Sequence, residues 1–137
     1  MTDDREALLK VVAGLVPATA EQVGTALGKL SIDLQKLTEQ LAQADEDSTR
    51  LTEEYQLAYD MAFLEAGEGD ERVTGAVREA TARVQTAQLR LNTEIAKLRV
   101  RQLRNAHRTL DRRIDVGRTQ AATVRSEHRT IGYGAGA

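Results

Sequence analysis

A run of apolar residues spaced alternately four and three positions apart constrains this chain more than any other feature. The run extends from Val23 to Ala62, and only Ser48, which is polar, and Tyr55, which is amphipathic, interrupt its apolar character. This is the spacing of the buried seam of a coiled coil. It predicts one long helix with the seam Val23, Leu27, Leu30, Leu34, Leu37, Leu41, Ala44, Ser48, Leu51, Tyr55, Ala58 and Ala62.

Local signals predict where this helix begins and ends. Thr19, followed three residues later by Gln22, is the signature of a capping box. Residues 67–70 read Gly-Glu-Gly-Asp, in which a glycine can end one helix and Asp70 can cap the next. A four-residue link between two long helices predicts an antiparallel hairpin in which residue i faces roughly residue 137 − i. Gly24 and Gly28, one turn apart, indicate a close approach of another backbone.

The second helix is predicted to begin in register and then to slip. Its first seam comprises Val73, Val77, Ala80, Val84, Ala87, Leu91, Ile95 and Leu98. The rhythm then slips, which resembles the stutter of a coiled coil, and it resumes at Leu103, Ala106, Leu110, Ile114, Gly117, Ala121 and Val124. Leu89, Val100 and Leu103 lie outside the first seam and form a second strip. Two apolar strips on one helix predict that more than two helices meet, and hence a homo-oligomer.

The predicted fold is therefore all-α, a long antiparallel helical hairpin that oligomerises. Residues 1–17 form a short amphipathic helix, which Pro17 ends and which docks on its own hairpin or on a neighbouring subunit. Residues 18–130 form the hairpin with its turn at 67–70, and residues 131–137 form a flexible Gly-rich tail. With one Phe, three Tyr and no Trp, a large globular core is not expected.

The residue types exclude several kinds of chemistry. The chain has no Cys, which excludes disulfides, thiol catalysis and cysteine zinc sites. His107 and His128 lie ~30 Å apart on one predicted helix and cannot share a metal. The run of residues 45–47 lacks the glycine and terminal glutamate of a calcium loop. We find no nucleophile, acid–base pair or phosphate loop, so the sequence predicts no enzyme, no cofactor and no metal site.

The start of the chain predicts a cytoplasmic protein. The pattern Ala18-Thr19-Ala20 resembles a signal-peptidase site, but the region before it is acidic and Lys10 interrupts its apolar run. No segment approaches the ~20 apolar residues that a membrane span needs.

The charge of the chain is strongly divided between its halves. Residues 1–71 hold 5 basic and 16 acidic side chains, whereas residues 72–137 hold 14 basic and 5 acidic ones. In the predicted register Arg83 and Arg90 face acidic residues, so we expect them to be paired. Residues 97–118 carry a net charge of +6 and face a stretch of net charge −1. The predicted nucleic-acid contacts are therefore Lys97, Arg99, Arg101, Arg104, Arg108, Arg112, Arg113 and Arg118.

Arginine suits bidentate contacts with phosphate, and aromatic residues that stack on bases are scarce. Binding is therefore expected to be electrostatic, salt-sensitive and sequence-nonspecific. The same patch is also suited to the acidic half of another subunit or the acidic tail of a partner protein.

Residues 53–122 resemble small helical proteins encoded by phages and prophages. The shared pattern is a Tyr/Ala-rich stretch, a short turn and a long Arg/Leu helix, which ends here in Arg112-Arg113-Ile114-Asp115-Val116-Gly117-Arg118. The overall plan resembles the UvsY-type recombination mediators of phages, which are short helical oligomers that bind single-stranded DNA and help to load a recombinase. The resemblance implies DNA contacts among the basic positions 99–118, an oligomer, a recombinase or single-strand-binding protein as partner, and the host cytoplasm.

Two functions follow as hypotheses. The first is a non-enzymatic recombination accessory protein that binds single-stranded DNA. The second is an oligomeric coiled-coil scaffold or regulator that binds a protein partner and no nucleic acid, and a phage-encoded inhibitor of a host protein is a third option of that kind.

Overall fold

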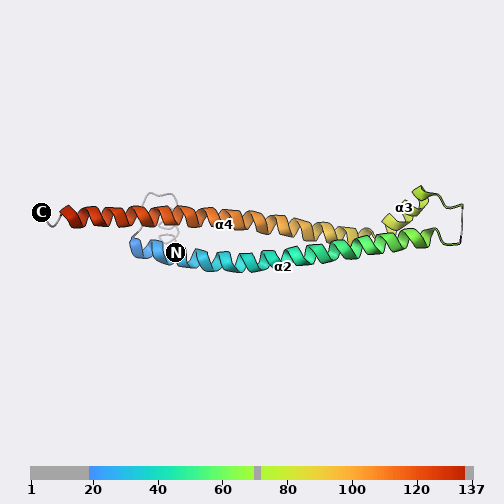
Figure 1. Cartoon of the computed structure of the whole chain (residues 1–137), viewed down its shortest axis with the longest axis horizontal. Helices are drawn as coiled ribbons and strands as arrows, with labels where there is room; N and C mark the ends of the chain where they lie inside the picture. The colour runs from blue at the N-terminus through green and yellow to red at the C-terminus, as the bar shows by residue number, and fades with distance from the viewer. Residues whose placement is uncertain (1–18, 70–71, 135–137) are drawn as a thin grey trace, which may run out of the picture. The chain divides into compact units, whose positions relative to one another are not determined.

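The computed structural model describes residues 19–69 and 72–134, with side chains up to Thr130. Its helices are α2 (Ala20–Ala66), α3 (Gly75–Gln85) and α4 (Ala87–Gly134), and the described residues contain no strand (Figure 1). This confirms the all-α class. The predicted helix at 3–15 and the predicted cap at Asp70 lie outside the described residues, as do residues 135–137.

The contacts divide the chain into two units, which we describe separately. Unit 1 contains described residues 19–35 and 108–134, and unit 2 contains residues 36–69 and 72–107. Helices α2 and α4 each contribute residues to both units, whereas α3 belongs to unit 2.

The ends of α2 follow the local signals of the sequence. The Thr19 backbone N–H donates to Gln22 Oε1 at 3.1 Å, and the Gln22 backbone N–H donates to Thr19 Oγ1 at 3.2 Å. This reciprocal pair is the predicted capping box. At the other end, the Gly67 N–H donates to the Leu64 carbonyl at 3.1 Å, and Gly69 adopts a φ of 80° that favours glycine.

The link between the helices is longer than the sequence predicts. Helix α3 begins only at Gly75, where the Thr74 hydroxyl accepts a hydrogen bond from the Val77 backbone N–H at 3.4 Å. Helix α3 then ends after Gln85, and Thr86 separates it from α4. The Thr86 hydroxyl donates to the Ala82 carbonyl at 2.6 Å, a back-bond of the kind that bends helices. The predicted single second helix is thus two helices.

The buried face of α2 is the predicted one. Each of the twelve predicted seam positions in α2 is buried or half-buried, and Val23, Ala44 and Ala62 are the most enclosed. A four–three spacing places these positions on one face of a helix. The hydrophobic pattern therefore identified the inward side of α2 correctly.

The first part of the predicted seam of the second helix is wrong, whereas its continuation from Leu103 is confirmed except at Ala106. Val77, Val84, Leu91, Ile95 and Leu98 are exposed, with Val84 at 77%. The inward positions of unit 2 are instead Ala82, Thr86, Leu89, Thr93, Ala96, Val100, Leu103 and His107. In unit 1 they are Leu110, Ile114, Gly117, Ala121 and Val124. These positions alternate four and three throughout, so the predicted slip does not occur in the buried face.

In unit 2, small and hydrogen-bonded side chains explain why the inward face of α4 is less apolar than its outward face. The Thr93 hydroxyl lies 3.0 Å from the Leu89 carbonyl and 3.2 Å from the Leu51 carbonyl of the facing helix. His107 Nε2 lies 3.2 Å from Thr38 Oγ1. Because these polar groups find partners, they can be buried at little cost.

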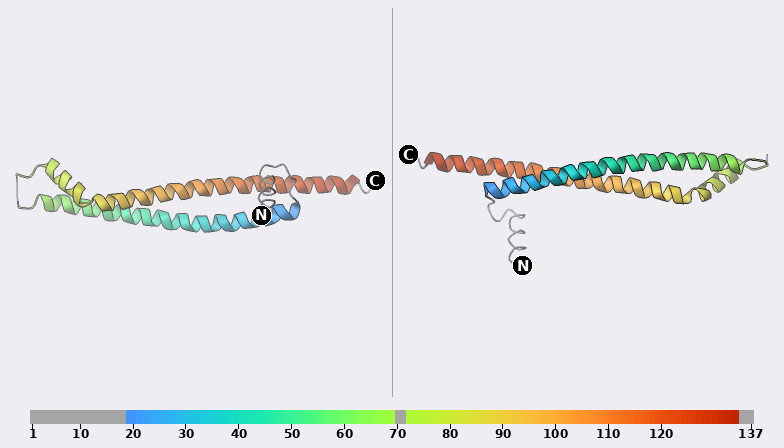
Figure 2. Two further views of the ribbon diagram at one scale, coloured as in Figure 1. Left: turned by 180° about the vertical axis from the view of Figure 1, so that it is seen from behind. Right: turned by 90° about the horizontal axis from the view of Figure 1, so that it is seen from below.

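In unit 2, α2 and α4 lie side by side in opposite directions in every view (Figure 2). Thr93 contacts Leu51, where the predicted register would have placed residue 86. His107 contacts Thr38, where it would have placed residue 99. The observed register is thus displaced by seven or eight residues, because a link longer than four residues and the separate helix α3 lie between α2 and α4.

Replacing Gly24 or Gly28 by alanine is expected to stabilise the protein by roughly 0.5–1 kcal/mol each, since glycine is a poor residue in a helix interior. A Cβ at either position meets nothing within 4 Å in the described residues. The matched control is Gly117→Ala, whose Cβ would lie 2.6 Å from Leu27 Cδ2 and forces that side chain to move. Urea denaturation measures the free energy of unfolding of all three variants. A loss of stability in Gly24→Ala would instead indicate the close backbone contact that the sequence predicts.

Candidate nucleic-acid interface

The eight predicted contact residues all lie on α4 and are all exposed, but they fall into both units. Unit 2 holds Lys97, Arg99, Arg101 and Arg104, and unit 1 holds Arg108, Arg112, Arg113 and Arg118. The two sets have different surroundings, so each is described in its own unit.

The cations of unit 2 are partly matched by carboxylates. Arg104 Nη2 lies 3.2 Å from Asp45 Oδ1 on α2, and Lys97 Nζ lies 3.7 Å from Glu94 Oε1 on its own helix. The predicted register pairs Arg90 with residues 45–47, whereas the structure brings Arg104 to Asp45. The displaced register places residues 99 and 100 opposite Asp45, and Arg104 lies about one helical turn further along α4. For Arg99 and Arg101, the described residues provide no ion pair.

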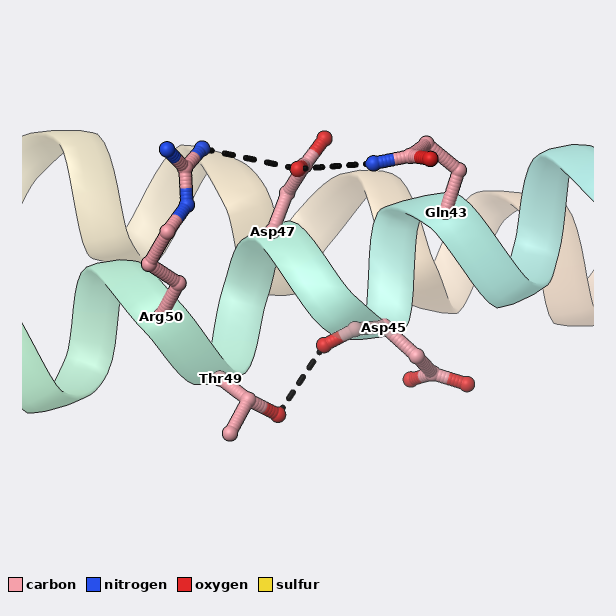
Figure 3. A network of polar contacts seen from close by, with 5 residues as sticks. All are labelled: Gln43, Asp45, Asp47, Thr49 and Arg50. Carbon is pink, nitrogen blue, oxygen red and sulfur yellow. Dashed lines mark hydrogen bonds and ion pairs between the residues drawn. The ribbon is translucent and has the colours of Figure 1, made fainter.

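Within the acidic residues 45–47, Asp45 and Asp47 also form contacts with other residues of α2 (Figure 3). The Asp47 carboxylate lies between Gln43 Nε2, at 3.1 Å, and Arg50 Nη2, at 3.5 Å. The Asp45 backbone carbonyl accepts the Thr49 hydroxyl at 3.0 Å, which leaves the Asp45 carboxylate for Arg104. Acidic side chains thus lie beside the basic residues of unit 2, which disfavours a polyanion there.

The arginines of unit 1 have fewer acidic neighbours on α2 than the cations of unit 2. Arg118 Nη1 lies 3.8 Å from Asp115 Oδ1, with both side chains about 70% exposed. Arg108, Arg112 and Arg113 form no ion pair with any described residue. Residues 108–118 hold four arginines against Asp111 and Asp115, a net charge of +2, and the charged residues of α2 in this unit are Glu21, Lys29 and Asp33, a net charge of −1. An excess of one positive charge therefore remains in residues 108–118, a shorter segment than the sequence predicts.

A groove adjoins these arginines in unit 1. It has a volume of about 410 Å³ and lies between the start of α2 and residues 109–120 of α4. Its walls include the apolar side chains of Val23, Leu27 and Val116, and Arg112 and Arg113 line it as well. Gly117 lies opposite Leu27, so the helices come close here. The groove thus joins an apolar surface to two guanidinium groups.

Sequence reasoning did not find this groove. Val23 and Leu27 were assigned to the seam, where they do lie, but their side chains also border open space beside Arg112. Val116, which is 60% exposed, is an apolar residue of the Arg-rich segment that faces outward. A heptad pattern alone does not show which seam residues remain partly accessible.

The described residues offer no metal site and no membrane span. Among residues 19–69 and 72–134, no three His, Asp or Glu side chains gather in a way that could hold a metal ion. His107 lies in the seam of unit 2, and His128 is exposed on α4. None of the described helices has an apolar stretch of the length and purity that crossing a membrane requires. Comparison of the chain with protein-family models, with curated proteins and with solved structures found no match.

Proposed function

We propose that the protein is a non-enzymatic accessory protein that binds single-stranded DNA without sequence preference through Arg108, Arg112, Arg113 and Arg118 of unit 1. The observation that supports this most directly is the set of exposed guanidinium groups, three of them without an ion pair in the described residues. Guanidinium groups bind phosphate oxygens in a bidentate manner, and their loss of hydration on binding is small.

The adjoining groove favours a single strand over a duplex. In a single strand the bases are free to turn outward, and their faces are apolar enough to bury against aliphatic side chains. Val23, Leu27 and Val116 offer such a surface beside Arg112 and Arg113. A duplex presents only its phosphates and groove edges to a helix, so it would not use this surface.

The wider function rests on the resemblance to UvsY-type mediators. We propose that the protein assists the loading of a recombinase, with a recombinase or a single-strand-binding protein as its partner in the cytoplasm. We also propose that α2 and α4 pack as a coiled coil, because the buried positions of both helices alternate four and three. A second candidate function, a scaffold that binds only protein, is favoured by the exposed apolar residues of unit 2.

Binding to a fluorescein-labelled oligonucleotide of about 30 nucleotides tests the proposal by fluorescence anisotropy. We expect a dissociation constant in the range of about 1–100 µM near physiological salt, which is typical of nonspecific binding. Each phosphate contact contributes a slope of about −0.7 to the logarithm of affinity against the logarithm of salt concentration, so four arginines predict a slope near −3. Absence of binding at low salt would falsify the proposal, and equal affinity for a duplex of the same length would remove the role of the groove.

A further inference from the structure

Exposed apolar side chains gather in unit 2. Of the ten large apolar residues that are exposed among the described residues, eight lie in this unit. Leu57, Met61 and Leu64 form one group on α2, which we name the α2 strip, and are 52–63% exposed. Leu91, Ile95 and Leu98 form another on α4, the α4 strip, and are 48–58% exposed. Exposed apolar residues in such groups mark interaction surfaces.

Both strips have the spacing of a helix-packing face and lie away from the buried seam. The members of each strip are four and three residues apart, which aligns them along the helix. At 100° per residue, the α2 strip lies about 120–125° and the α4 strip about 160–165° around its helix from the mean direction of the seam. The α2 strip and the α4 strip therefore point away from each other in unit 2, and neither can cover the other in the same molecule.

The charges beside the two strips are complementary. Glu53 and Asp60 border the α2 strip on one side and Glu65 on the other, and residues 51–66 contain no cation. Arg99 borders the α4 strip on one side and Arg101 on the other, and neither forms an ion pair with a described residue. Glu94, the acid beside this strip, is paired with Lys97 at 3.7 Å. One strip is thus bordered by anions and the other by cations.

Grooves flank the α4 strip on both sides. One, of about 260 Å³, is lined by residues that include Leu51, Ile95 and Arg99. The other, of about 400 Å³, is lined by residues that include Val100, Arg101 and Arg104. Acidic residues also line these grooves, namely Asp47, Asp45 and Glu94, but each is engaged by a neighbouring side chain. Arg99 and Arg101 therefore remain to meet the carboxylates of an incoming helix.

We propose that the α2 strip of one molecule docks on the α4 strip of a second copy of this chain. The apolar side chains form the centre of the contact, and Glu53, Asp60 and Glu65 face the arginines that border the α4 strip, as flanking charges do in coiled coils. The contact joins two different surfaces, so it is heterologous. Every molecule keeps one free strip after pairing, and assembly continues beyond a dimer until a ring closes. Because it uses unit 2 alone, this interface is independent of DNA binding by unit 1.

Two double variants test the proposal by light scattering at about 100 µM protein, well above a micromolar dissociation constant. We expect the wild type to form an assembly larger than a dimer. Leu57→Glu with Met61→Glu removes the α2 strip, Ile95→Glu with Leu98→Glu removes the α4 strip, and each double variant alone should be monomeric. The control Ile32→Glu, at an exposed apolar position of α2 in unit 1, should assemble like the wild type.

Mixing the two double variants distinguishes this interface from a symmetric one. Each retains the strip that the other has lost, so the mixture should form a 1:1 dimer and nothing larger. A monomeric wild type would overturn the proposal, as would a mixture that stays monomeric. Wild-type assembly of the α2-strip variant alone would also overturn it, since that result requires α4 strips to pair with each other.

A cysteine experiment on the otherwise native surface gives a second measurement. The chain has no Cys, so Met61→Cys and Ile95→Cys each introduce a single thiol. After mixing and mild oxidation, we expect the disulfide between the two variants to exceed the homodimer of either variant at least several-fold. Equal yields of all three products would contradict the pairing of the α2 strip with the α4 strip.

Discussion

Replacing Val100 by aspartate is expected to melt the helical structure of unit 2, whereas replacing Leu98 by aspartate should leave it folded. Val100 is 6% exposed in the seam, and Leu98 is 48% exposed on the opposite side of α4. An aspartate at position 100 would replace a buried apolar side chain of the seam by a charged one, which destabilises a protein by about 3 kcal/mol or more. Circular dichroism during thermal unfolding measures both variants at low micromolar concentration.

The pair is closely matched, because the two positions are two residues apart on one helix and receive the same new side chain. The heptad reading of the sequence predicts the opposite order, with Leu98 in the seam. A greater loss of thermal stability for Leu98→Asp than for Val100→Asp would therefore show that the inward face of α4 is the predicted one. Assembly of Leu98→Asp is expected to change, but its helicity at 20 °C is not.

Reversing the charge of Arg108 and Arg112 is expected to lower affinity for single-stranded DNA by at least a hundredfold. Each substitution removes one phosphate contact and adds a repulsive carboxylate. The loss should shrink at high salt, and the salt slope should fall by about 1.4, since each missing contact removes about 0.7. Anisotropy titrations at two or more salt concentrations measure both quantities.

The matched control is Arg50→Glu with Arg83→Glu, which changes the net charge equally in unit 2. We expect it to weaken binding by less than about fivefold, because it alters only the general field of the protein. Equal losses in the two double variants would mean that the DNA responds to net charge alone. In that case unit 1 would contain no defined interface.

The first half of the fold was predictable because its sequence signals agree with each other. The seam of α2 is apolar at nearly every position, and the capping box at Thr19 marks its start. For such a helix, the apolar face and the buried face coincide. The all-α class follows from the same pattern and from the scarcity of aromatic residues.

The inward face of α4 before residue 100 was not predictable from hydrophobicity, since the more apolar face is the exposed one there. Thr86 and Thr93 are buried, whereas Leu91 and Ile95 are exposed. A hydroxyl that donates to a carbonyl of its own helix hides its polarity, and the amino-acid sequence does not show that contact. The apparent slip near residue 100 is the point at which the apolar residues move from the outward strip to the inward seam.

A basic surface on α4 was predictable from the sequence, but the set of residues that form the candidate site was not. The excess of arginine in residues 97–118 is a property of the sequence, and exposure of all eight predicted cations is consistent with it. The acidic neighbours of each cation depend on the register between α2 and α4. That register depends on the length of the link between the helices, which the Gly-rich turn in the sequence does not show. The contact between Arg104 and Asp45 and the groove beside Arg112 are products of that register.

One side-chain contact of unit 2 bears on the alignment of its two helices. An apolar zipper repeats every seven residues, so sliding one helix by one repeat produces a competing structure of similar energy. Sliding by one repeat would leave Thr93 beside another backbone carbonyl, but it would separate His107 from the Thr38 hydroxyl. At about 1 kcal/mol for that contact, the slipped form is disfavoured on the order of fivefold. The pair of His107 and Thr38 thus favours one alignment among several that the apolar residues alone would accept.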